Sequence, residues 1–206
     1  MPNTRPATKS EQQRRFEAII RADPDLMRLL RAIRSIGLPQ WRLVAGCLYQ
    51  TVWNVLTGRA RGRGIRDYDL IYFDEDLSWA AEDAMIRRVA VAARGCVGPV
   101  ETRNQYASVV HAVGVRLGDD DRLDVAAPFG LDDVFAMVIR PNRALDNAAS
   151  HGAKARRAQA IWPEVTVIPW DDATPVPIGQ TVVSLLDAGG DRRDFPSAFA
   201  SPNRRR

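Results

Sequence analysis

Apolar residues recur at helical spacing near the start of the chain, and this pattern predicts helical structure over residues 11–36. The positions that define the spacing are Phe16, Ile19, Ile20, Leu26, Leu29, Leu30 and Ile33. Pro24, which follows Asp23, divides the segment into two helices because proline lacks the N–H that a helix interior needs. Gly37 ends the second helix.

From there to about residue 170, short apolar runs alternate with helical patterns. The expected strands are residues 41–45, 68–73, 100–103, 109–117, 122–126 and 165–168. The expected helices are residues 47–57, 77–92, 129–138 and 144–160. The turn sequence GDDD at 118–121 joins two of the strands as a hairpin. This order predicts an α+β fold, a mixed β-sheet flanked by helices.

The composition suggests three segments. Residues 1–37 form an N-terminal helical segment that packs on the core, residues 38–170 form the main domain, and residues 171–206 are a mostly irregular tail. No apolar run is long enough to cross a membrane, and the N-terminus lacks the apolar stretch of a secretory signal. We therefore expect a cytoplasmic protein. Two cysteines are too few for a disulfide scaffold.

The charge of the chain is unevenly distributed. The formal net charge is +4, and residues 1–40 carry eight basic and four acidic groups. Residues 41–170 carry sixteen of each sign, and the tail carries five of each. Because the central part is neutral, the high isoelectric point does not indicate a nucleic-acid surface.

Three features of the central part point to phosphate and metal chemistry. Gly46 stands where a strand leads into a helix, so backbone N–H groups there face an approaching phosphate. Asp67 and Asp69 lie two residues apart at a strand start, which sends both carboxylates to one face, where hard divalent cations would neutralise them. Asp124, between Leu123 and Val125, faces away from the core if those two face it.

This arrangement suits two-metal phosphoryl or nucleotidyl transfer, with Asp67, Asp69 and Asp124 as metal ligands. Arginines in the preceding loop are expected to contact phosphate oxygens; they are Arg59, Arg61, Arg63 and Arg66. Each feature taken alone also has a plain structural explanation, as a turn glycine, a loop cap, an exposed strand position or a solvated loop. Their order along the chain favours the functional interpretation.

Longer strings of sequence carry a family resemblance. LVAGCLYQTVWN, GIRDYDLIYFDEDLSWAAEDAMIRR, VETRNQ and AAPFGLDDVFAMVIRPN resemble uncharacterised bacterial nucleotidyltransferase-like proteins of the polymerase-β-type superfamily, over roughly residues 38–168. The resemblance implies the nucleotidyltransferase fold, transfer of a nucleoside monophosphate from an NTP to an unidentified acceptor, and Mg²⁺ or Mn²⁺. It also implies that Gly46 and Cys47 support the triphosphate and that Asp67, Asp69 and Asp124 are catalytic.

The sequence also departs from that superfamily. Cys47 stands where the superfamily usually has Gly or Ser, and the segment after Asn104 and Gln105 is shortened. These departures leave a second hypothesis open, a catalytically silent nucleotide-binding or protein-interaction module. Metal-dependent phosphoester hydrolysis is a third.

Other conspicuous residues are interpreted as structural. We expect His111 to be a packed or partnered histidine rather than a catalytic base, and His151 to be solvated. Four aromatic residues are expected in the core: Trp53, Trp79, Phe129 and Phe135.

Overall fold

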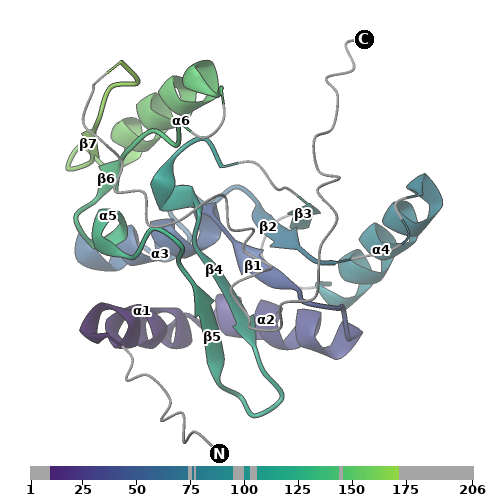
Figure 1. Cartoon of the computed structure of the whole chain (residues 1–206). Helices are drawn as coiled ribbons and strands as arrows, with labels where there is room; N and C mark the ends of the chain where they lie inside the picture. The colour runs from purple at the N-terminus through teal and green to yellow at the C-terminus, as the bar shows by residue number, and fades with distance from the viewer. Residues whose placement is uncertain are drawn as a thin grey trace, which may run out of the picture.

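A five-stranded mixed sheet forms the centre of the protein, whose structure is a computed structural model (Figure 1). The residues that it describes are 10–73, 76, 78–94, 100–102, 106–143 and 146–171. Nearly all of the tail, residues 172–206, therefore lies outside the described residues, as do Asn104 and Gln105.

The helices, in chain order, are α1 (Glu11–Ala22), α2 (Pro24–Ile36), α3 (Gly46–Leu56), α4 (Trp79–Ala92), the 3-10 turn η1 (Val109–His111), α5 (Asp132–Phe135) and α6 (Ala148–Ile161). The strands are β1 (Arg42–Val44), β2 (Tyr68–Ile71), β3 (Val100–Thr102), β4 (Gly114–Leu117), β5 (Leu123–Ala126), β6 (Val138–Ile139) and β7 (Thr166–Val167). The predicted α+β class with a mixed sheet is confirmed.

The strand order in the sheet is β3-β2-β1-β4-β5. Among the five described strands of this sheet, β2 and β3 pair in parallel, and the other neighbours are antiparallel. Asp69 is the register partner of Val44 in β1 on one side and of Glu101 in β3 on the other. On the far side of β1, Val44 pairs with Gly114, which pairs with Ala126.

The predicted division at Pro24 is confirmed, and the cause is local. Asp23 ends α1 and caps α2, since its carboxylate accepts hydrogen bonds from the backbone N–H groups of Asp25 and Leu26 at 3.0 and 3.1 Å. Pro24 occupies the first turn of α2, where the missing N–H costs nothing. Gly37 ends the helix in the left-handed conformation, with φ of 70°.

One predicted strand is only partly a strand. Residues 109–111 form the 3-10 turn η1, and regular pairing begins at Gly114. The turn is fixed by tertiary contacts, because the Val109 N–H donates to the carbonyl of Arg140 at 2.9 Å. The sequence pattern also missed β6, two residues long, which pairs in parallel with β7.

The two faces of the sheet have different environments. One face and the helices α1, α2 and α3 share the main hydrophobic core, which includes Leu43, Leu70 and Val115. The opposite face carries a smaller apolar cluster of Val44, Ala45 and Ala126, with Ile71 and Tyr106 packed against it. Because side chains alternate along a strand, Asp69 shares this second face with its register partner Val44.

The glycine- and arginine-rich loop after α3 is anchored on α6. Asn54 holds it, because the Asn54 side chain donates to the carbonyl of Arg63 at 3.0 Å and accepts from the Trp162 indole at 3.1 Å. Trp162 is buried against Trp53, with ring centroids 5.4 Å apart. Gly64 passes so close to this ring that a Cβ there would lie 2.4 Å from it. The loop is therefore fixed against the protein.

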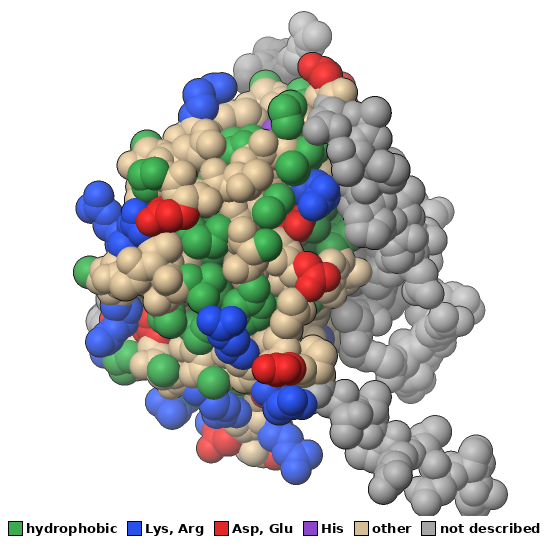
Figure 2. Space-filling model, turned by 90° about the vertical axis from the view of Figure 1, so that its left-hand side faces the viewer, with side chains coloured by type: hydrophobic (Ala, Val, Ile, Leu, Met, Phe, Trp, Pro, Cys, Tyr) green, Lys and Arg blue, Asp and Glu red, His purple; other side chains and the backbone are tan. Residues whose placement is uncertain are grey.

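Across the residues that the structure describes, every helix is too short or too polar to span a membrane. On the face that Figure 2 shows, Lys and Arg side chains are interleaved with Asp and Glu, so no continuous basic patch forms there. This distribution agrees with the balanced charge of the central sequence.

Candidate active site

The connection between β1 and α3 brings the N-terminus of a helix to the edge of the second face. Ala45 turns the chain with φ of 59°, a conformation that costs a residue with a Cβ about 1–2 kcal/mol. Its N–H donates to the carbonyl of Val113 at 2.9 Å, which holds the turn in place. No side chain caps α3, and no acidic residue lies in its first turn. The first N–H groups of α3, those of Gly46 and Cys47, therefore have no acceptor within the helix.

Asp67 and Asp69 lie beside this helix start. The antiparallel register pairs Val44 with Asp69. The pairing ends at these two residues, and Asp67 precedes Asp69 by two positions along the chain. Both carboxylates are close enough to Cys47 that their charges raise the pKa of its thiol. The structure therefore brings together Gly46, Cys47, Asp67 and Asp69.

The side chain of Cys47 does not reach the open side of the α3 N-terminus. The thiol is fully buried, and Sγ donates to the carbonyl of Val44 at 3.4 Å. Burial, and then the negative charge of Asp69, raise the pKa of the thiol well above its ordinary value. The side chain therefore points into the protein and leaves the helix start open.

A thiol of this kind should be inert. In a Cys96→Ser variant, which leaves one cysteine, we expect no measurable alkylation of folded protein by iodoacetamide at pH 8, because only the thiolate reacts and the folded state disfavours it. The same protein in urea should react fully. Mass spectrometry measures both, and rapid labelling of the folded protein would show that the thiol is accessible.

Buried polar groups surround the same helix start. Gln50 is buried, and its amide Nε2 donates to the Tyr49 hydroxyl at 3.1 Å while Oε1 has no hydrogen-bond partner within the described residues. Tyr106 packs on the second face, and its buried hydroxyl has no hydrogen-bond partner among the described residues. Burial, and then the charge of Asp69, raise the pKa of Tyr106. Sequence analysis missed Tyr106, which no motif marks.

Asp124 lies elsewhere on the sheet. It belongs to β5, and two strands, β1 and β4, separate β5 from β2. Its carboxylate accepts a hydrogen bond from Arg42 at 2.8 Å, and Arg116 lies 3.5 Å from the same oxygen. The sheet order therefore does not bring Asp124 beside Asp69.

The residue next to Asp69 in the sheet is Glu101. Its backbone position in β3 is the direct register partner of Asp69. The signal available in the sequence was the string VETRNQ, but choosing Glu101 over Asp124 required the strand order.

The arginines of the loop before β2 divide into two groups. Arg59 pairs with Glu164 at 2.9 Å, and Arg61 lies 3.9 Å from Asp25, so both point toward the surface of other helices and loops. Arg66 is exposed and directly precedes Asp67. Of these three, Arg66 is the one that directly precedes the carboxylates along the chain.

Two of the structural interpretations need correction. His151 is buried rather than solvated: Nδ1 lies 2.8 Å from the Ser108 hydroxyl, and Nε2 lies 3.0 Å from the carbonyl of Ile168. Trp79 is 85% exposed at the start of α4. His111 is packed, with its ring 5.4 Å from that of Tyr49, and burial lowers its pKa well below the ordinary value. Trp53 is in the core, as predicted.

Within the described part of the chain, no three His, Cys, Asp or Glu side chains form a ready metal-binding group. Asp67 and Asp69 provide two carboxylates from one strand, and Glu101 occupies the adjacent register position. Oxygen ligands of this kind suit Mg²⁺ or Mn²⁺.

The sheet with its helix start and paired carboxylates has the architecture of a nucleotidyltransferase. A solved structure described as "a CCA-adding enzyme head domain" matches it with a TM-score of 0.62 and 21% sequence identity, over 79% of this chain and 98% of that one. A model of a nucleotidyltransferase family matches residues 31–111 and 100–167. The chain belongs to this nucleotidyltransferase family. No curated protein matches the sequence.

Proposed function

We propose that this protein transfers a nucleoside monophosphate from an NTP to an acceptor at the start of α3, with Mg²⁺ or Mn²⁺. The observation that carries the proposal is the convergence of an uncapped helix N-terminus with Asp67 and Asp69, both of which act electrostatically on Cys47. A helix start favours an anion, and the carboxylates favour cations. An NTP with its metal ions combines both charges in one ligand.

The donor set fits such metal ions. One carboxylate oxygen of Asp69, Oδ1, is buried at the second face, and carboxylate oxygens are the ligands that Mg²⁺ and Mn²⁺ prefer. Asp67 and Asp69 would hold the metal ions, and we assign the third carboxylate to Glu101, which the strand order favours over Asp124. When bound, the metal ions would neutralise the phosphates and polarise the phosphorus–oxygen bonds.

Residues of the protein would bind the triphosphate. The N–H groups of Gly46 and Cys47 would bind the triphosphate, and Arg66 would contact its oxygens. The acceptor oxygen forms a bond to the α-phosphorus as the bond to pyrophosphate breaks. The acceptor hydroxyl loses its proton to water as the new bond forms. Cytoplasmic location belongs to the same proposal, since both NTP and Mg²⁺ are abundant there.

The direct test is calorimetric titration of the four NTPs into the protein, with Mg²⁺ and then with EDTA. We expect binding of at least one NTP that depends on the metal ion. If folded protein binds none of the four under either condition, the transferase proposal is wrong.

Gly46 offers a more specific test. Replacing it with alanine (Gly46→Ala) places a Cβ 3.3 Å from the Gln50 amide, a flexible group that can shift, so we expect stability to change by less than about 1 kcal/mol. The methyl group would stand where phosphate approaches the backbone and should weaken NTP binding about tenfold. Gly152→Ala in α6 is the matched control and should leave NTP affinity unchanged. Equal NTP affinity in both variants would show that Gly46 is not part of the nucleotide-binding site.

A second function is favoured by one observation. Because the Cys47 side chain is buried, it adds no donor of its own to the phosphate site. A nucleotide-binding module without turnover would therefore keep the same geometry. Such a module would bind NTP with metal but release no pyrophosphate with any acceptor. A phosphohydrolase would instead consume NTP without labelling an acceptor.

A further inference from the structure

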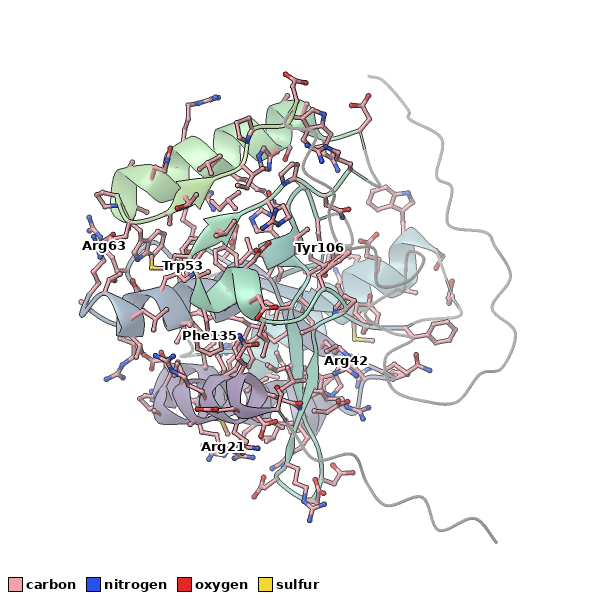
Figure 3. The ribbon with its side chains drawn as sticks, turned by 60° about the vertical axis from the view of Figure 1, so that its left-hand side comes forward. Arg21, Arg42, Trp53, Arg63, Tyr106 and Phe135 are labelled. Carbon is pink, nitrogen blue, oxygen red and sulfur yellow. The ribbon has the colours of Figure 1, made fainter. Side chains whose placement is uncertain are left out.

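A second charged group lies on the same face of the sheet as Asp69. It consists of Arg42 in β1, Arg116 in β4 and Asp124 in β5, of which Arg116 and Asp124 are register partners. Arg42 precedes Val44 by two residues and therefore faces the same side. The row of these residues lies about 7 Å along the strands from the row of Asp69. Figure 3 shows Arg42 beside the hairpin of β4 and β5.

The contacts within this group leave Arg116 weakly engaged. The Arg42 side chain is only 4% exposed and donates to Asp124 twice, at 2.8 Å to the carboxylate and 3.2 Å to the carbonyl. Arg116 has one contact of 3.5 Å with the same carboxylate oxygen, which Arg42 already neutralises. Its Nε is buried and has no hydrogen-bond partner among the described residues, while 40% of its side chain is exposed. The guanidinium of Arg116 is thus able to bind a further anion.

The charged group and the start of α3 lie at opposite ends of β1. The start of α3 lies at the end of β1, Arg42 lies at its beginning, and Asp69 lies level with Val44 between them. In phosphoryl transfer the attacking and leaving oxygens stand roughly in line. If pyrophosphate leaves toward α3, the acceptor approaches from the side of Arg42 and Arg116.

We propose that Arg116, oriented by Arg42 and Asp124, binds a phosphate group of a small acceptor molecule. This inference rests on the proposed transferase function and names the class of its acceptor. A guanidinium presents several donors in a plane that matches phosphate oxygens. Nucleic acid is disfavoured because residues 41–170 carry equal numbers of acidic and basic groups, and three acids occupy the tip of the hairpin, Asp119, Asp120 and Asp121.

The probe is inorganic phosphate, titrated calorimetrically into protein loaded with Mg²⁺ and α,β-methylene-ATP, so that the nucleotide site is filled. We expect Arg116→Gln to weaken phosphate binding about tenfold, with nucleotide affinity within about twofold of wild type. Arg116→Lys keeps the charge and should lose less. Arg122→Gln, in the same hairpin with an 83% exposed side chain, is the matched control and should bind phosphate as wild type does.

Wild type and Arg116→Gln would both be checked for folding by circular dichroism. Equal phosphate affinity in the two folded proteins would overturn the inference and show that Arg42, Arg116 and Asp124 only stabilise the sheet. Arg116-dependent binding of an RNA hexamer, tighter than phosphate and falling steeply with salt, would overturn the choice of a small acceptor. Failure of wild type to bind the α,β-methylene analogue of any of the four NTPs would instead refute the proposed function. Phosphate titrated without nucleotide then still tests Arg116 by itself.

Discussion

Replacing Asp67 and Asp69 together with asparagine is expected to abolish metal-dependent NTP binding, lowering affinity by roughly 100-fold or more. The two carboxylates flank the start of α3, so their removal takes away the anionic oxygens that hold a divalent cation. Calorimetry of the preferred NTP with Mg²⁺ measures the loss. Pyrophosphate release, once an acceptor is known, should fall at least as far.

The same double variant should fold as well as wild type or better. Asparagine keeps the size of aspartate and part of its hydrogen-bonding capacity, and the repulsion between the two carboxylates is removed, so the melting temperature should stay close to that of wild type. Asp119→Asn with Asp120→Asn is the matched control, because it removes two neighbouring charges from an exposed turn. NTP binding that survives in the first variant, or falls equally in both, would show that Asp67 and Asp69 do not form the site.

Gly64→Ala is expected to destabilise the protein by about 3 kcal/mol. Gly64 has φ of 82°, where a Cβ costs about 1–2 kcal/mol. The added methyl group would also lie 2.4 Å from Trp162 and 3.0 Å from Ile161. Trp162 has little room to move, since it is 1% exposed and hydrogen-bonded to Asn54. Urea denaturation measures the loss as a lower midpoint with an unchanged slope.

Gly62→Ala separates the cost of the positive φ from the cost of the contact with Trp162. Gly62 lies in the same loop with φ of 74°, but a Cβ there would meet nothing within 4 Å. The free energy of unfolding of this variant should therefore fall only by the cost of placing a Cβ at positive φ, about 1–2 kcal/mol. If both variants lose the same free energy of unfolding, the contact between Gly64 and Trp162 does not constrain the loop.

Much of the fold could be predicted because its causes are local. The break at Pro24 follows from one missing N–H and the capping carboxylate of Asp23. The approach of Asp69 to Gly46 was also predictable, since a strand, its helix and the next strand follow one another along the chain. The burial of His151 was not, because Ser108 and Ile168, its partners, are remote in sequence.

The sequence by itself predicted the helices α1, α2 and α3, the α+β class, and the order of Gly46, Asp67 and Asp69 that suggests a common site. Only the tertiary structure decided that Glu101 stands beside Asp69 while Asp124 binds Arg42. The physical reason is that alternation along a strand fixes which face a side chain takes, whereas hydrogen bonding between distant segments fixes which strands are neighbours.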